Sequence, residues 1–398
     1  METLKSFMRF TSYLRDLRNC TAWGMLSLAV CMLTLDVSAI AQQPTIMTID
    51  APGAGTSNGY GTEGIAINSA GQIAGLYAGY FNAMRAYVRA TDGRIIMFDA
   101  PGAESPGEGV PFPPNDSLGT YAVGMDDSGA VTGYVINAHG VSHSYLLAAD
   151  GTTFTMFDVP GAGTGHGQGT FAGNMSMSGG LIAGWYIDAT GMNHGFVRAG
   201  NGAVTEFDVP AAATGPGLGT TTVWAQCVNP AGAVTGYYFD QNGAVHGYVR
   251  NPDGTIATFD APGAGTGSGQ GTYTWAINPA GTTAGASQDN NGVYHGLLRT
   301  ADGKITLFDI EGAGTGAGQG TQAEGINPSG VVTGYYTDAS NVSHGYVRAA
   351  DGTFTFFDAP GAGKGSGQGT FPMTNNSRGA VTGYYIDGGG VYHAFVRH

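Results

Sequence analysis

The chain has 398 residues, of which 70 are glycine and 17 are proline, and its formal net charge is −14 at pH 7. An acidic chain without a basic stripe repels phosphate backbones, so nucleic acid is not expected as a partner. Hydrophobic residues make up 42% of the chain and include 20 tyrosines and 18 phenylalanines. This is enough apolar material for a packed core and excludes a low-complexity, disordered chain.

Residues 1–41 have the three parts of an export signal. A start rich in Lys and Arg is followed by an apolar run over 23–35 and by a small-residue cleavage site at Ala39 and Ala41. The apolar run is shorter than the roughly 20 residues of a membrane-spanning helix, and no other stretch is long and apolar enough for one. We therefore expect a secreted or periplasmic protein cleaved near Ala41, with a lipoprotein anchored at Cys31 as the alternative.

The rest of the chain, 42–398, is expected to be one domain of tandem repeats. A Phe-Asp phrase, Ile-Asp in its first copy, recurs seven times. Its aspartates are Asp50, Asp99, Asp158, Asp208, Asp260, Asp309 and Asp358. A repeat with a period of 20–50 residues is typical of solenoids, propellers and arrays.

The repeat over 320–358 predicts four short strands and three tight turns. The strands are expected at 322–326, 331–336, 344–348 and 353–357, where apolar, aromatic and threonine residues gather. The turns between them read Asn-Pro-Ser-Gly, Asp-Ala-Ser-Asn and Asp-Gly. A long glycine-rich connection follows each Phe-Asp and leads to the next repeat. Each repeat is therefore predicted to be an antiparallel meander.

Seven meanders stacked radially predict an all-β fold, a seven-bladed β-propeller of four-stranded antiparallel blades. Residues 45–50 form a fourth strand that lacks the preceding three, and 370–397 form three strands that lack a fourth. We therefore expect the last blade to be closed by the N-terminal strand. A β-solenoid is the rival fold, but its rungs repeat faster and lack three hairpin turns in each period.

The third strand of the repeat begins with His-Gly or a close variant, as in HGFVR at 194–198 and HAFVR at 393–397. It follows the pattern I-N-x-x-G-x-x-x-G. In these features residues 45–398 resemble the HAF-type extracellular repeat family, although Arg85-Ala86 replaces the dipeptide in the first repeat. The resemblance implies secretion and a repeated β-fold, and it implies no particular activity.

The recurring polar residues are interpreted as structural. Six repeats have a histidine in the third strand, and equivalent positions in a ring cannot converge on one metal ion. We expect each to bond the turn Asp or Asn six residues earlier, as in Asp240 and His246. The Phe-Asp carboxylates are expected to accept N–H groups of the glycine-rich connection. The arginine that ends the third strand is expected to pair with a nearby Asp.

No cofactor is expected, and calcium is left open. The chain is acidic and D-x-x-G turns are frequent, but no EF-hand ladder of metal ligands occurs. The connection 361–370 contains Lys364 yet lacks the G-K-[ST] run and following helix of a phosphate-binding loop. Cys227 is the only cysteine within 42–398, so a disulfide inside that part is excluded and a buried, inert thiol is expected.

A ligand needs one distinctive place, so we expect a binding site where the repeat is broken. The connection 100–118 is longer than the others. Its candidate residues are Glu104, Glu108, Phe112 and Asp116. The candidate aromatic residues are Trp185, Trp224 and Trp275. Exposed tryptophans suit a sugar or peptide site, whereas the same side chains buried between blades would be core.

The sequence therefore favours a secreted, non-enzymatic binding protein whose ligand is an extracellular glycan, peptide or partner protein. One alternative is an extracellular hydrolase or lyase acting on polysaccharide or lactone. It needs carboxylates or a histidine that converge at the channel mouth from non-equivalent repeat positions. The other alternative is a structural surface protein that self-associates.

Overall fold

The computed structural model describes residues 44–79, 83–103, 118–222 and 226–398. Within these ranges the chain forms 28 β-strands and no helix, so none of the described segments is a helix that could cross a membrane. The predicted export signal, 1–41, lies outside the described residues.

The strands fall into four sets according to their place in the repeat. The first strands are β2 (Gly61–Ile67), β6 (Gly119–Met125), β10 (Gly169–Met175), β14 (Gly219–Thr221), β18 (Gly271–Ile277), β22 (Gly320–Ile326) and β26 (Gly369–Asn375). The second strands are β3 (Ile73–Ala78), β7 (Val131–Ile136), β11 (Ile182–Ile187), β15 (Val234–Phe239), β19 (Thr283–Gln288), β23 (Val332–Thr337) and β27 (Val381–Ile386).

The third strands are β4 (Met84–Arg89), β8 (Ser142–Leu147), β12 (Asn193–Arg198), β16 (Val245–Arg250), β20 (Tyr294–Arg299), β24 (Ser343–Arg348) and β28 (Tyr392–Arg397). The fourth strands are β5 (Ile95–Phe98), β9 (Phe154–Phe157), β13 (Val204–Phe207), β17 (Ile256–Phe259), β21 (Ile305–Phe308), β25 (Phe354–Phe357) and β1 (Ile46–Ile49). In the repeat analysed from sequence, the observed strands agree with the predicted ones to within two residues at each end.

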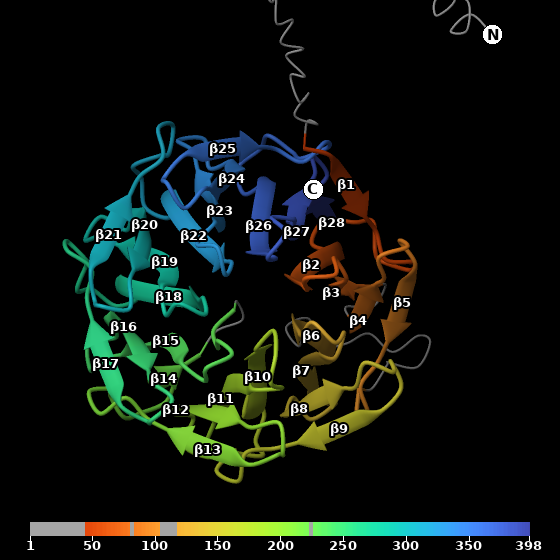
Figure 1. The fold of residues 1–398 in the computed structure, drawn as a ribbon, viewed down its shortest axis with the longest axis vertical. Helices are drawn as coiled ribbons and strands as arrows, with labels where there is room; N and C mark the ends of the chain where they lie inside the picture. The colour runs from red at the N-terminus through yellow and green to blue at the C-terminus, as the bar shows by residue number, and fades with distance from the viewer. Residues whose placement is uncertain (1–43, 80–82, 104–117, 223–225) are drawn as a thin grey trace, which may run out of the picture. The chain divides into compact units, whose positions relative to one another are not determined.

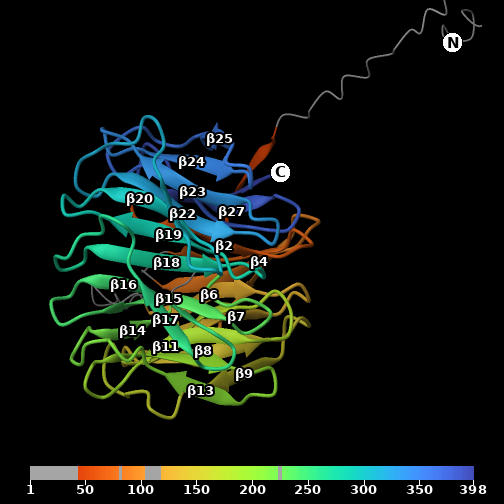
Figure 2. The same cartoon turned by 60° about the vertical axis from the view of Figure 1, so that its left-hand side comes forward.

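Each set of four consecutive strands pairs antiparallel, and the seven resulting units form a closed ring (Figure 1). We number the units 1 to 7 from β2 to β26. The first strands lie innermost and the fourth strands outermost. We call the space that the first strands enclose the lumen. Figure 2 shows the strands running between the two ends of the ring, where the turns and connections lie.

The N-terminal strand completes unit 7, as the sequence predicts. β1 pairs antiparallel with β28, with Ile46 opposite Arg397 and Ile49 opposite Ala394. Unit 7 therefore takes three strands from the C-terminus and one from the N-terminus. This pairing joins the two ends of the described chain within one sheet.

A buried aromatic ring packed over a glycine recurs in most units. Tyr346 in β24 is 0% exposed and lies opposite Gly334 in β23. A Cβ at Gly334 would lie 2.8 Å from the Tyr346 hydroxyl and 2.1 Å from a backbone oxygen, so only glycine fits. The ring also donates a hydrogen bond from its hydroxyl to the Gln322 carbonyl, over 2.8 Å. Packing and hydrogen bonding thus tie the first three strands together.

Glycine also begins each first strand. Gly369 has a φ of 120°, and a Cβ there would lie 2.1 Å from the carbonyl oxygen of Ser343 in unit 6. The next residue, Thr370, accepts a hydrogen bond from the buried Ala359 N–H over 2.9 Å. The Gly-Thr pair that opens the repeat therefore fixes each unit against its neighbour.

Asparagine side chains link the ends of the first strands around the lumen. Asn327 Nδ2 donates to the Asn376 carbonyl over 3.0 Å, and Asn376 Nδ2 donates to the Asn68 carbonyl over 2.9 Å. Asn229 and Asn278 continue the series through units 4, 5 and 6. Each Oδ1 also accepts backbone N–H groups of its own turn. The sequence alone did not reveal the bridges between units.

Unit 4 departs from this regularity. Its first strand has only three residues, and Gln226 then bonds three other units. Its carbonyl accepts the Ile277 N–H, its Oε1 accepts the Ile326 N–H, and its Nε2 donates to the Asn375 carbonyl. Cys227 beside it is 0% exposed, and burial raises the pKa of its thiol to about 12. The prediction of a buried thiol is confirmed.

Candidate functional site

In units 3 to 7 a histidine lies between two carboxylates, beside the turn that joins the second and third strands. We call this region of each unit the rim, and we call the histidine with its two carboxylates the clamp. In unit 6, His344 Nδ1 lies 3.1 Å from both carboxylate oxygens of Asp358, and its Nε2 lies 3.6 Å from Asp338. The contact to the turn aspartate confirms the prediction. The Phe-Asp carboxylate was expected to bind the connection, and this was wrong: it faces the histidine, because a threonine hydroxyl already binds the next N–H.

Related arrangements recur in the other units, with Asn137 in place of the turn aspartate in unit 2 and Arg85 in place of the histidine in unit 1. The other histidine–aspartate pairs are His143–Asp158, His194–Asp208, His246–Asp260, His295–Asp309 and His393–Asp50. In unit 1, Arg85 replaces the histidine and forms a two-bond ion pair with Asp99. Because every unit pairs its Phe-Asp or Ile-Asp carboxylate with a histidine or an arginine, this pairing is a feature of the architecture.

The arginine that ends the third strand was predicted to pair with an Asp on the surface, and this was also wrong. Arg198 lies with its guanidinium 4.7 Å from the centre of the Phe157 ring, which belongs to unit 2. Arg299 lies 4.5 Å from Phe259 in the same way. A cation above an aromatic face gains electrostatic energy while its stem covers apolar surface. These contacts therefore join adjacent units.

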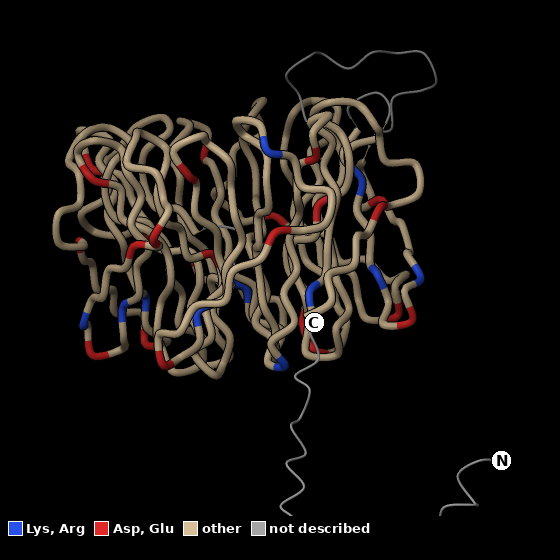
Figure 3. Tube along the Cα trace, turned by 90° about the horizontal axis from the view of Figure 1, so that it is seen from above, with Lys and Arg blue, Asp and Glu red and all other residues tan. Residues whose placement is uncertain are grey.

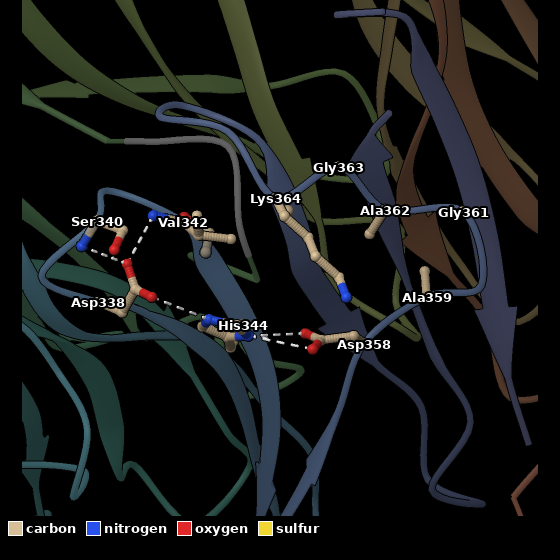
Figure 4. A pocket seen from close by; sticks show the side chains of 12 residues that line it. Asp338, Ser340, Val342, His344, Asp358, Ala359, Gly361, Ala362, Gly363 and Lys364 are labelled. Atoms are coloured by element: carbon tan, nitrogen blue, oxygen red, sulfur yellow. Dashed lines mark hydrogen bonds and ion pairs between the residues drawn. The ribbon is translucent and has the colours of Figure 1, made fainter. Parts of the chain in front are cut away.

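Unit 6 has a groove with a volume of about 580 Å³. The clamp residues Asp338, His344 and Asp358 form one wall, and the connection 359–369 forms the other (Figure 4). Lys364 extends across the groove toward Asp358.

The groove combines fixed acceptors with one cationic donor. The Asp358 side chain is 53% exposed, so it retains acceptor capacity beyond its bonds to His344. Burial raises the pKa of Asp338, but N–H bonds from Val342 and Ser340 lower it below the ordinary value, so this carboxylate stays charged. The residues equivalent to Lys364 are Thr56, Thr164, Thr214, Thr266 and Thr315. The lysine therefore makes this groove chemically distinct.

Two carboxyl groups lie on first strands near the lumen. Glu63 is in β2, and Glu324 is the bulged residue of β22, where the register shifts between Ala323 and Gly325. Burial raises the pKa of Glu63 to about 7 and that of Glu324 to about 8. Both are single departures from the repeat. The sequence signal was their acidic type at positions where no other unit has an acid.

The predicted aromatic candidates are not brought together. Trp185 in β11 stacks on Phe171 with ring centres 5.0 Å apart, and Trp275 in β18 lies 6.1 Å from Tyr273. Both tryptophans are partly buried and belong to units 3 and 5. The other candidates lie outside the described residues and stay predictions: Trp224, Glu104, Glu108, Phe112 and Asp116.

Charge at the two ends of the ring differs (Figure 3). Most Lys and Arg residues lie at one end, where acidic residues lie beside them. Among the described residues, no group of three His, Cys, Asp or Glu side chains is placed to hold a metal ion. In units 3 to 7 the clamp carboxylates pair with the histidine between them.

No protein-family model matches this chain, and neither does any curated protein sequence. Its fold resembles that of BP39L lectin from Burkholderia pseudomallei, with 10% identity and a TM-score of 0.52 over 84% of this chain and 94% of the lectin. The Aleuria aurantia lectin, a six-bladed β-propeller, aligns at 13% identity with a TM-score of 0.40 over 89% and 91% of the two chains.

At such identities the likeness concerns the fold alone. Only the likeness to the BP39L lectin, with a TM-score above 0.5, supports an argument about the fold. Together with the radial arrangement of antiparallel units, it shows an all-β, tandem-repeat architecture of the β-propeller kind.

Proposed function

We propose that this chain is an exported saccharide-binding protein, built as a seven-bladed β-propeller whose last blade is closed by β1. The observation that carries the proposal is the groove in unit 6, where Asp358 and Lys364 face one space of about 580 Å³. Similarity to lectins of the same architecture supports a binding role. Export, with cleavage near Ala41, is part of the proposal because of the N-terminal pattern.

The groove chemistry suits a sugar. Adjacent hydroxyls of a pyranose can donate to a half-exposed carboxylate and accept from an ammonium group, as Asp358 and Lys364 offer. His344 and the turn around Asp338 hold the Asp358 carboxylate in position. Glycine residues of the connection leave its backbone close to a ligand, without intervening side chains.

The test is a glycan array with the purified full chain, followed by calorimetric titration of any sugar found. Asp358→Asn should weaken binding by about tenfold or more, and Lys364→Thr should weaken it less. Asp309→Asn removes the same carboxylate from unit 5, which has a threonine in place of the lysine, and should leave binding unchanged. Failure to bind any glycan, or equal losses in all three variants, would overturn the proposal.

Peptide and protein ligands are the nearest alternatives, and binding to a peptide array without glycan binding would favour them. The hydrolase or lyase alternative gains support from Glu63 and Glu324, which come from non-equivalent repeat positions, as that hypothesis requires. Release of product from a polysaccharide or lactone panel, lost in Glu324→Gln, would establish it. The structural alternative predicts self-association, which light scattering measures directly.

A further inference from the structure

The outermost strand of unit 1 has one side without a partner strand. β5 pairs antiparallel with β4, and it pairs with no other described strand. In an antiparallel pair, alternate residues direct their N–H and C=O groups away from the partner strand. No hydrogen bond joins these outward backbone groups of β5 to the rest of the described chain. An open edge of this kind can pair with another chain, so its side chains determine whether it stays free.

The two central residues of β5 are both large, apolar and exposed. Ile96 is 43% exposed and Met97 is 41% exposed, and successive residues of a strand point to opposite faces of the sheet. At these two positions every other unit has at least one threonine. The threonines are Thr48, Thr155, Thr205, Thr258, Thr306 and Thr355. Unit 1 therefore differs from the other units in presenting apolar side chains on both faces of its outer strand.

The outer strands on either side of unit 1 extend this apolar surface. Met47 in β1 of unit 7 is 50% exposed, and Met156 in β9 of unit 2 is 36% exposed. Figure 1 shows β1, β5 and β9 in succession along the outside of the ring. In the described part of units 3 to 5, no large hydrophobic side chain is exposed to this extent. Apolar side chains gathered over neighbouring elements are typical of an interaction site.

The charges around β5 indicate which partner fits. Residues 84–99, which span β4 and β5, contain three arginines and two aspartates, although the whole chain has a net charge of −14. The Arg94 side chain, before β5, is 70% exposed. Asp99, after β5, is bound by Arg85 and is still 29% exposed. If two copies of β5 pair antiparallel, the Arg94 end of each strand meets the Asp99 end of the other, so opposite charges meet at both ends.

We propose that β5 is the contact surface for a second copy of this chain, with the two β5 strands paired antiparallel about a two-fold axis. The pairing gives partners to the outward N–H and C=O groups and covers Ile96 and Met97. Because both copies use the same surface, the assembly closes at two copies. It therefore differs from the open assembly expected of a structural surface protein. The contact is independent of the saccharide groove, which lies in unit 6.

The test is sedimentation velocity of the purified full chain over a range of about 1 to 200 μM. We expect a monomer–dimer equilibrium with a Kd on the order of 10 μM, because one strand pair buries less surface than a standard interface. Ile96→Lys should raise this Kd by about tenfold or more, since lysine on an edge strand opposes pairing. Thr306→Lys is the matched control: it changes the equivalent residue of β21 and should leave the Kd unchanged.

Arg94→Glu tests the charge pairing at the ends of the two strands. It places an acid near Asp99 of the second copy, so the Kd should rise by about fivefold. Lys304→Glu is the matched control, because Lys304 precedes β21 as Arg94 precedes β5, and it should have no effect. Hydrogen exchange of the unmodified protein gives a readout that needs no variant. Amides of 95–98 should gain protection with rising protein concentration, whereas those of 305–308 should not.

Four results would overturn the proposal. They are a monomer over the whole concentration range, assembly beyond two copies, an unchanged Kd in Ile96→Lys, and equal effects of each variant and its control. Sedimentation of a monomeric protein with phosphatidylcholine vesicles would also overturn it, because the apolar surface would then be a lipid contact. A thermal scan of each variant verifies that it is folded, which is expected because the substituted side chains are exposed.

Discussion

The carboxyl groups at the rim and those near the lumen have opposite environments. At the rim, each clamp carboxylate faces a histidine or arginine, and the turn aspartates also accept backbone N–H groups. Near the lumen, Glu63 and Glu324 have no such partner among the described residues, and burial favours their protonated form. A carboxylate paired with a histidine or an arginine is found at the rim of every unit, whereas each lumen acid occurs once. Repeated positions thus build the ring, and departures from the repeat are the candidates for function.

The largest expected loss of stability comes from breaking a contact between neighbouring units, because the rim and the lumen both depend on such contacts. Gly369→Ala would place a Cβ 2.1 Å from the Ser343 carbonyl oxygen at a φ of 120°, so we expect a loss of about 3 to 5 kcal/mol in unfolding free energy. Gly367→Ala is the control, because it also has a positive φ but no atom within 4 Å of its Cβ. It should lose only about 1 to 2 kcal/mol in the same urea titration.

Glu324→Gln tests the lumen side of the comparison. The folded-state pKa is raised from 4.5 to about 8, so the contribution of Glu324 to stability is most favourable below pH 4.5 and is lost as pH rises toward 8. The variant lacks this dependence and should be the more stable protein at pH 8.5, by on the order of 3 kcal/mol. Urea titrations at pH 4 and 8.5 measure the difference. Equal pH profiles for the two proteins would show that Glu324 is not buried without a partner.

Asn327→Ala probes the bridges between first strands. It removes the bond to the Asn376 carbonyl and the two turn bonds accepted by Oδ1, so a loss of about 1 to 3 kcal/mol is expected. Ser329→Ala changes the same turn without touching a bridge and should cost little. A thermal scan of both variants distinguishes the loss of the Asn327 side-chain bonds from the effect of changing the turn sequence alone.

The smallest change in unfolding free energy is expected for a substitution at the rim. Burial raises the pKa of Asp188, but hydrogen bonds from Thr190 and Met192 lower it further, to about 2. Its contribution to stability is present above the unfolded-state pKa of roughly 4 and is lost as pH falls through 2. Asp188→Asn should therefore cost less than about 1 kcal/mol at pH 7 and nothing at pH 2. Acid titration of both proteins, followed by fluorescence, gives the comparison.

The sequence predicted the architecture well because its signals are local and repeated. Asn-Pro-Ser-Gly at 327–330 and Asp-Gly at 351–352 define turns, and the incomplete repeats at both ends define closure through β1. Contacts between units were predicted poorly. The stacking of Arg198 on Phe157 and the bridge from Asn327 to Asn376 depend on the distance between neighbouring sheets, which no turn or strand pattern encodes.

The candidate sites show the same limit. Lys364 and the two lumen glutamates were visible as departures from the repeat, but their significance depends on burial and on which side chains surround them. Trp185 and Trp275 are equally conspicuous in the sequence, yet the structure places them two units apart and packs each against a neighbour. Rarity within a repeat indicates where to look, whereas three-dimensional surroundings decide what a residue can do.

The pairing of β1 with β28 has a consequence for how the chain is made. Asp50 and His393, which meet beside this pairing, are 343 residues apart in the sequence, so the last sheet is incomplete until β28 has left the ribosome. Contacts of such long range form late, because the loop between them must first be closed. A growing chain would expose an open sheet edge until β28 is made, and deletion of β1 or β28 would reopen that edge.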